Sequence, residues 1–177
     1  PGKASYANNC LLARRLAEAG LKGLVFAGAR KSAELIARYA AHPLVRPYRA
    51  GYTARERRRL EADLKEGRVR VLVSTSALEL GVDIGELDAV VLVGYPGSTA
   101  AFWQRAGRAG RGERRALLVY IPREDPMDEY FLHRPALLLE SPPEEAVADP
   151  QNPVLCPLHL HAAAREKPLL AEELLCP

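Results

Sequence analysis

The sequence predicts an α/β fold, with a mainly parallel sheet and helices on both faces of that sheet. Two observations support this prediction. Short apolar segments alternate along the chain with segments of helical periodicity, as in a series of β-α-β units. The segments at residues 69–74 and 89–93 are also apolar almost throughout, whereas a strand with one solvated face would alternate apolar with polar residues.

The predicted elements follow one another in a regular order up to residue 121. Thr53 and Glu56 have the spacing of a capping box at the start of one helix. Pro47 limits its segment to a short or edge strand, because proline cannot donate to a sheet. We expect helices at residues 5–20, 30–41, 53–66 and 77–80, a further helix within 101–115, and strands at 24–26, 44–49, 69–74, 89–93 and 116–121.

From residue 122 the chain changes character, because prolines break residues 122–177 into short pieces. We expect a helix within 125–139, interrupted near Pro135, and a second helix at 158–166. The prediction is therefore one α/β domain at residues 1–121, followed by a Pro-rich, mostly helical extension that acts as a connector and opens another module.

The composition is that of a soluble globular protein, with 48% hydrophobic and 27% charged residues and a net charge of +3. No apolar segment approaches the roughly 20 residues of a membrane helix, so we expect no membrane partner.

Three cysteines without a CxxC pair indicate a reducing compartment, and we expect a cytoplasmic protein. Cys156, His159 and His161 match no common zinc spacing, so no metal site is predicted. Since Pro1 is not a start residue, we expect a piece of a longer protein.

Basic charge is concentrated at residues 101–115, which hold five arginines, one acid and three glycines. If this segment is helical, Gln104, Arg108 and Arg111 lie at i, i+4 and i+7 and share one stripe. The fixed fork of donors in arginine matches phosphate oxygens, so the stripe suits a polyanion. The alternative is a solvated basic helix end.

The ends of the predicted strands carry the other candidate residues. Ligands of open parallel sheets gather at the carboxyl ends of the strands. Each strand here leads into hydroxyl, glycine or charged residues, which would form one rim. The candidates are Arg30, Gly51, Ser74, Thr75, Gly81 and Asp83.

Three segments resemble motifs of the superfamily 2 helicases. Residues 24–34 (LVFAGARKSAE) resemble motif IV, residues 71–85 (VLVSTSALELGVDIG) motif V, and residues 104–111 (QRAGRAGR) motif VI. The segment YRAGYTARERRRLE and the tail that follows residue 129 resemble the YprA/MrfA-type DNA-repair helicases. This resemblance implies a second, C-terminal RecA-like domain at residues 1–121. It also implies the start of a winged-helix-like or accessory module at 122–177.

The resemblance implies a nucleotide role for five of the candidate residues. Arg108 and Arg111 would be arginine fingers that reach the γ-phosphate of ATP on another domain. Gln104 would help to place the attacking water or the γ-phosphate. Asp83 would bind the ribose or couple the nucleotide state to the DNA groove, and Gly81 would permit a tight turn. Caps of local structure are the alternatives for Asp83 and Gly81.

The resemblance also implies contacts with the nucleic-acid backbone. Ser74 and Thr75 match hydroxyl positions of motif V, and Arg30 matches the basic residue of motif IV. Gly51 lies in a loop where a backbone amide can meet a phosphate. A capping role for Thr75 and a solvated helix start for Arg30 are the alternatives.

The sequence contains no GxxxxGK[ST] phosphate-binding loop. ATP and Mg²⁺ are therefore expected to bind mainly to a domain absent from this chain, the N-terminal RecA-like domain of the same protein. The predicted function is that of the C-terminal domain of an ATP-dependent 3′–5′ DNA helicase or translocase, in DNA repair. Its substrate would be single-stranded DNA or a duplex with a tail, and the isolated chain would be inactive as an ATPase. An RNA helicase domain, or a nucleic-acid-binding module without an ATPase partner, are the alternatives.

Overall fold

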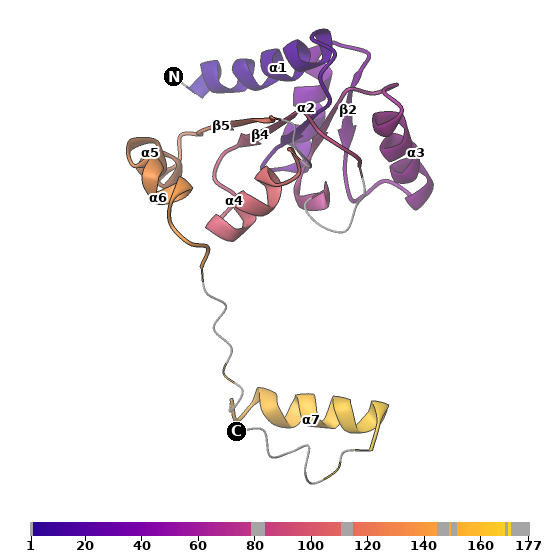
Figure 1. The fold of residues 1–177 in the computed structure, drawn as a ribbon, viewed down its shortest axis with the longest axis vertical. Coiled ribbons are helices and arrows are strands. Elements are labelled where there is room, and N and C mark those ends of the chain that lie inside the picture. Colours follow the sequence, from indigo (N-terminus) through magenta and orange to yellow (C-terminus); the bar gives the residue numbers. More distant parts are fainter. Residues whose placement is uncertain are drawn as a thin grey trace. The chain divides into compact units, whose positions relative to one another are not determined.

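The computed structural model describes residues 2–78, 84–110, 115–144, 149, 152–168 and 170, with side chains from residue 7 onward. It divides into two compact units, Pro1–Glu144 and Glu145–Pro177. The first unit contains a five-stranded sheet in the order β2-β3-β1-β4-β5, and all neighbouring strands are parallel (Figure 1). The predicted fold class is confirmed.

The observed elements agree closely with the predicted ones. The prolines divide the extension as expected, since one helix ends before Pro135 and the next begins there. The element expected at 77–80 is a single 3₁₀ turn (η1, Ser76–Leu78). No helix in the described part of the chain is both long and apolar enough to cross a bilayer. The strands are β1 (Gly23–Phe26), β2 (Val45–Tyr48), β3 (Val71–Ser74), β4 (Ala89–Val93) and β5 (Leu117–Ile121), and the helices are α1 (Gly2–Glu18), α2 (Arg30–Ala40), α3 (Ala54–Lys65), α4 (Thr99–Ala106), α5 (Pro126–His133), α6 (Pro135–Leu139) and α7 (Leu155–Glu166).

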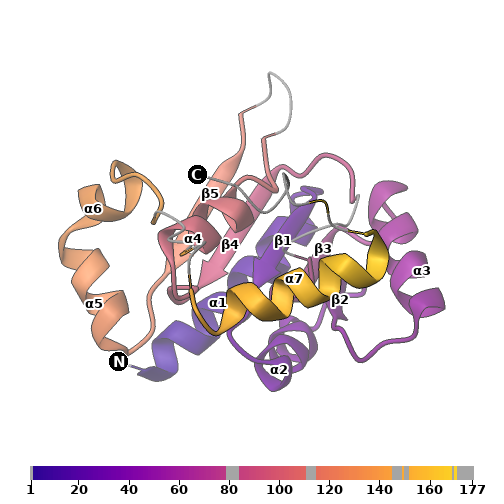
Figure 2. The same ribbon diagram turned by 90° about the horizontal axis from the view of Figure 1, so that it is seen from below.

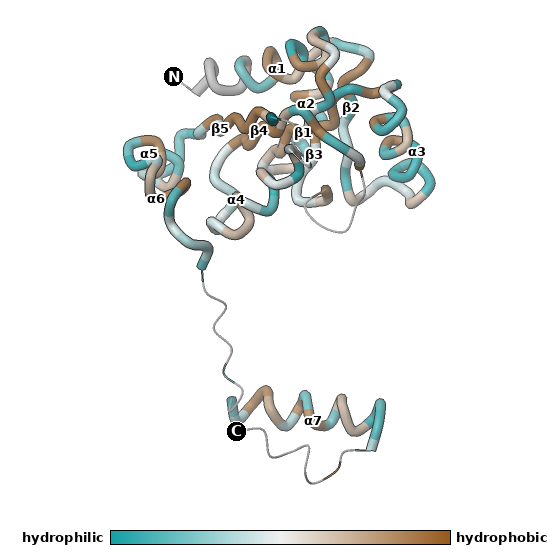
Figure 3. The backbone as a smooth tube through the Cα atoms, viewed as in Figure 1, coloured by the Kyte–Doolittle hydropathy of each residue, from teal (hydrophilic) through white to brown (hydrophobic). Residues whose placement is uncertain are grey.

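Helices cover both faces of the sheet, which explains the apolar strands. Every residue of β1, β3 and β4 is buried, and these strands form part of the apolar layer in Figure 3. On one face, α1 and α2 contribute a core that includes Ala13, Leu16 and Ile36. On the other face, the core is completed by residues of α3, η1, α4, α5 and α6, which are Leu64, Leu78, Phe102, Phe131 and Leu138.

The first unit extends beyond the boundary predicted at residue 121. Phe131 of α5 and Leu138 of α6 are 8% and 3% exposed and belong to the second core cluster. These two helices are therefore part of the α/β unit. The second unit contains α7, which buries none of its residues among those that the structure describes. The module that this unit would open stays a prediction.

The capping box at α3 is formed as predicted and gives a test of the fold. The Thr53 hydroxyl accepts a hydrogen bond from the Glu56 amide (3.2 Å), and Glu56 Oε2 accepts one from the Thr53 amide (2.8 Å). We expect Thr53→Ala to lower the free energy of unfolding by about 1 kcal/mol, because it leaves a helix N–H without its acceptor. Urea unfolding measures this change. Thr53→Ser keeps the hydroxyl and should match the wild type, and equal losses in both variants would refute the capping role.

Candidate functional site

The carboxyl edge of the sheet is divided by the direction in which the chain leaves each strand. After β1 the chain enters α2, whose buried residues lie in the core on one face. After the neighbouring strands β3 and β4 it enters η1 and α4, which pack on the opposite face. Figure 2 shows this edge with α2 and α4 on different sides of the sheet. Such a change of side opens a crevice at the strand ends, which is where α/β sheets bind ligands.

Arg30 is the first residue of α2 and is exposed. The N-cap residue Ala29 makes no side-chain hydrogen bond, and the first turn of this fully described helix holds no acidic residue. The helix therefore presents its N–H groups, the positive end of its dipole and the basic Arg30 and Lys31 together. This combination suits a phosphate group.

Ser74 and Thr75 lie at the end of β3, and the structure separates them. Ser74 is fully buried, and its hydroxyl has no hydrogen-bond partner among the described residues. In the sheet register it pairs with Tyr48 and Phe26. In this structure the hydroxyl of Ser74 is closed to a ligand from solvent, whereas Thr75 is half-buried and sits just beyond the strand.

Gly51 lies in a turn after β2, in which the Tyr52 amide donates to the Arg49 carbonyl (3.1 Å). An added Cβ would meet nothing within 4 Å, so no packing contact requires a glycine here. The backbone at Gly51 is therefore open to solvent. Arg49 beside it pairs with Glu34 of α2 (2.8 Å) and stacks on the Tyr52 ring (4.9 Å).

The predicted helical stripe of Gln104, Arg108 and Arg111 is wrong in its geometry, because α4 ends at Ala106. Gly107 caps the helix, and the chain continues through turns to Gly110, whose φ of 75° is left-handed. The Gly110 amide donates to the Leu87 carbonyl (3.3 Å), which fixes this turn against the loop before β4. Gln104 is exposed and Arg108 is 9% exposed, so the two side chains differ in their access to solvent. Arg111, Gly81 and Asp83 lie outside the described residues.

Arg105 is a residue of this segment for which the sequence analysis predicts no role. Its guanidinium stacks on the ring of Phe26 at 5.3 Å from the ring centre, which joins α4 to the end of β1. Phe102 is buried in the core beside Tyr120, whereas Trp103 is 39% exposed. Arginine-rich spacing alone does not distinguish an arginine that packs on its own sheet from one that meets a ligand.

Glu144 positions the start of α4, although it lies 45 residues further along the chain. Its carboxylate accepts hydrogen bonds from the amides of Thr99 (2.6 Å) and Ala100 (2.9 Å), and Ser98 caps the Ala101 amide (3.0 Å). These backbone donors lower the pKa of Glu144 to about 2. The start of the arginine-bearing segment is thus held by the end of the first unit.

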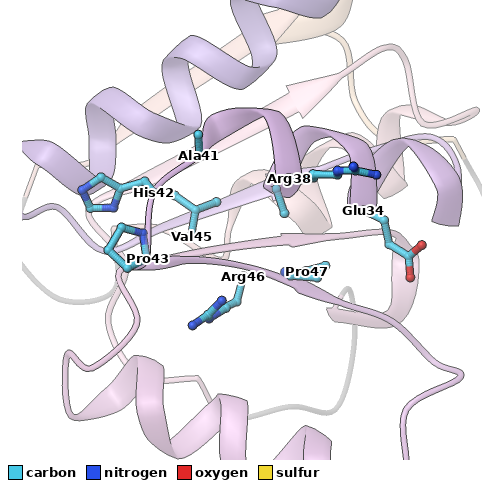
Figure 4. A pocket seen from close by; sticks show the side chains of 9 residues that line it. Glu34, Arg38, Ala41, His42, Pro43, Val45, Arg46 and Pro47 are labelled. Atoms are coloured by element: carbon cyan, nitrogen blue, oxygen red, sulfur yellow. The ribbon is translucent and has the colours of Figure 1, made fainter.

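A groove of about 380 Å³ runs beside the edge strand β2 (Figure 4). Its lining includes Glu34 and Arg38 of α2 and Arg46 of β2. None of the described residues predicted for the site lines this groove. We therefore place the candidate site at the carboxyl edge of the sheet and not in the groove.

Comparison with known proteins identifies the family of this chain. Residues 3–113 match the family model of the helicase conserved C-terminal domain. The chain is 39% identical over 170 residues to the uncharacterised ATP-dependent helicase YprA of Bacillus subtilis, covering 92% of this chain and 23% of YprA. It is 38% identical over 166 residues to ATP-dependent helicase hrq1 of Schizosaccharomyces pombe, covering 88% of this chain and 16% of hrq1.

The solved structures give the same result. The chain superposes on the DUF1998 helicase MrfA bound to DNA with a TM-score of 0.82 and 38% identity, over 92% of this chain and 24% of MrfA. A second MrfA structure contains DNA and AMPPNP. The sheet and these likenesses define a RecA-like helicase domain. The chain belongs to the family of helicase conserved C-terminal domains of superfamily 2, and it spans a quarter or less of the length of these relatives.

The contact of Glu144 with α4 makes stability depend on pH. Because the folded-state pKa is about 2 against an ordinary value of 4.5, the stabilisation is complete above pH 4.5 and is lost as the pH falls toward 2. We expect Glu144→Gln to lower the urea-unfolding midpoint at pH 7, and the difference from the wild type to shrink steadily below pH 4.5. Glu140→Gln, an exposed neighbour with the same change of charge, is the control. A difference that is independent of pH would contradict the cap.

Proposed function

We propose that this chain is the C-terminal RecA-like domain of an ATP-dependent 3′–5′ DNA helicase or translocase that acts in DNA repair in the cytoplasm. The observation that carries the proposal is the arrangement at one edge of the sheet. The arginine-bearing segment after β4 and the basic start of α2 follow two neighbouring parallel strands at the same edge of the sheet, while the sequence lacks a phosphate-binding loop. The likeness to DNA-bound MrfA supports DNA as the ligand of this edge.

In this proposal the segment after β4 serves a nucleotide held by another domain. Arg108 and Arg111 would place positive charge against the γ-phosphate, and Gln104, which is exposed, would help to position the attacking water. Asp83 and Gly81 would complete the nucleotide side. The described residues contain no cluster of three or more carboxylate, histidine or cysteine side chains that could hold a metal. Because the sequence holds no phosphate-binding loop, we assign Mg²⁺ and most of the contacts with ATP to the N-terminal RecA-like domain.

The loops that follow β1, β2 and β3 serve the DNA backbone in this proposal. Arg30 and the N–H groups at the start of α2 would bind one phosphate, and the open backbone at Gly51 and the hydroxyl of Thr75 would bind neighbouring ones. The buried Ser74 could take part only after a local rearrangement. Contacts of this kind position the strand without reading its sequence.

Variants of the full-length protein separate the two roles. We expect Arg108→Ala to reduce DNA-stimulated ATP turnover by about 10³-fold, the lower end of the range for arginine fingers. Arg30→Ala should instead weaken single-strand binding and reduce the salt slope of log K by about 0.7. Arg38→Ala, at the other end of α2, is the matched control and should change neither. Arg108→Lys keeps the charge and most of the volume of the side chain, so it serves as the control for misfolding. Intact turnover in Arg108→Ala would end the arginine-finger assignment.

The choice between DNA and RNA has its own test. We expect the full-length protein to unwind a tailed DNA duplex in the presence of ATP and Mg²⁺ and to leave the RNA duplex of matching sequence largely intact. The phosphates of the two substrates are alike, so any preference must come from groove shape and the 2′-hydroxyl. Preferential unwinding of RNA would support an RNA helicase, and binding without any ATP hydrolysis would support a binding module.

A further inference from the structure

Arg123 lies over the carboxyl ends of β1 and β4. Strand β5 ends at Ile121, and after Pro122 the chain brings the Arg123 side chain back across Gly28 and Gly94. A Cβ on Gly28 would lie 2.9 Å from Nη1 of Arg123, and a Cβ on Gly94 would overlap the guanidinium. The Arg123 side chain can therefore lie across residues 28 and 94 only because both are glycines. Gly94 also has a φ of 81°, in the left-handed region that favours glycine.

This position lies between the two loops that leave β1 and β4. Gly28 belongs to the loop that leads to α2 on one face of the sheet, and Gly94 to the loop that leads to α4 on the other. Arg123 thus lies beside the loop that leads to Arg30, the first residue of α2, at the edge where an α/β sheet receives its ligand.

A buried carboxylate forms an ion pair with the guanidinium. Asp128 of α5 is fully buried, and its Oδ2 lies 3.4 Å from Nε of Arg123. Its Oδ1 accepts hydrogen bonds from the Tyr95 amide (2.6 Å) and from the Tyr120 hydroxyl. Burial and the Asp128 carboxylate raise the pKa of Tyr120, so this hydroxyl stays a donor at any working pH. The Tyr95 amide and the Tyr120 hydroxyl therefore hold the Asp128 carboxylate in place independently of Arg123.

The rest of the guanidinium remains available. The Arg123 side chain is 47% exposed, and its ion pair with Asp128 uses Nε. Among the described residues its terminal nitrogens make no ion pair. Two terminal nitrogens held in a fixed plane form the fork that binds phosphate oxygens well.

We propose that Arg123 binds a backbone phosphate of the DNA strand at the ends of β1 and β4, beside the phosphate assigned to Arg30. Asp128 is the positioning residue that holds the fork toward the crevice. This inference rests on the proposed function, since it adds a contact to the same DNA-binding edge. The rival explanation is structural, in which Arg123 serves only to neutralise the buried carboxylate.

Binding of a fluorescent single-stranded DNA oligonucleotide to the full-length protein across a series of salt concentrations tests the proposal. We expect Arg123→Ala to reduce the salt slope of log K by about 0.7 and the affinity at 0.1 M salt by about fivefold, as for the loss of one phosphate contact. Arg123→Lys keeps the charge and should retain the slope but bind less tightly. Arg38→Ala is the control and should retain both slope and affinity.

The double variant Arg123→Ala/Asp128→Asn separates binding from structure, because it leaves no uncompensated buried charge. A salt slope that stays reduced in the double variant supports the phosphate contact. Two results would overturn the phosphate contact of Arg123, which are recovery of the wild-type salt slope in the double variant and an unchanged slope in Arg123→Ala. In either case a reduced slope in Arg30→Ala would show that the proposed DNA-binding edge itself still holds. Failure of the wild-type protein to bind single-stranded DNA would instead overturn the proposed function and, with it, this inference.

Discussion

The central constraint on this molecule is the burial of both faces of its parallel sheet. Strands β1, β3 and β4 are buried at every residue, so each face must be covered by helices. The chain meets this requirement by sending α2 to one face and the elements after β3 and β4 to the other. The crevice at the strand ends is a direct consequence of this covering. The position of the candidate site therefore follows from the packing of the core.

Those parts of the structure that depend on local pattern could be predicted from the sequence. A strand covered on both faces must be apolar throughout, and a helix start needs an acceptor such as Thr53, so both leave a short readable signal. The end of α4 was missed because the i, i+4, i+7 spacing presupposes a helix, whereas Gly107 and Gly110 end it by their backbone conformation. The burial of Ser74 depends on the register with its neighbours Phe26 and Tyr48. A single strand does not reveal that register.

The residues that sequence reasoning missed act over long distances in the chain. Asp128 meets the Tyr95 amide 33 residues away, and Glu144 meets α4 45 residues away. Both follow the sheet, in the segment that was predicted to be a connector and the start of another module. An Asp after a Pro at a helix start, as at residues 126–128, signals a helix terminus and gives no indication of a tertiary partner.

These contacts give residues 122–144 a part in the site. Asp128 is held by the ends of β4 and β5 and forms an ion pair with Arg123, while Glu144 fixes the first turn of α4, the helix that carries Gln104 and Arg105. One carboxylate thus acts on the side proposed for DNA and the other on the side proposed for nucleotide. Because a single short segment supplies both, a displacement of α5 and α6 would disturb the two halves of the site together. The segment after β5 therefore contacts both the arginine proposed to bind DNA and the helix proposed to serve the nucleotide.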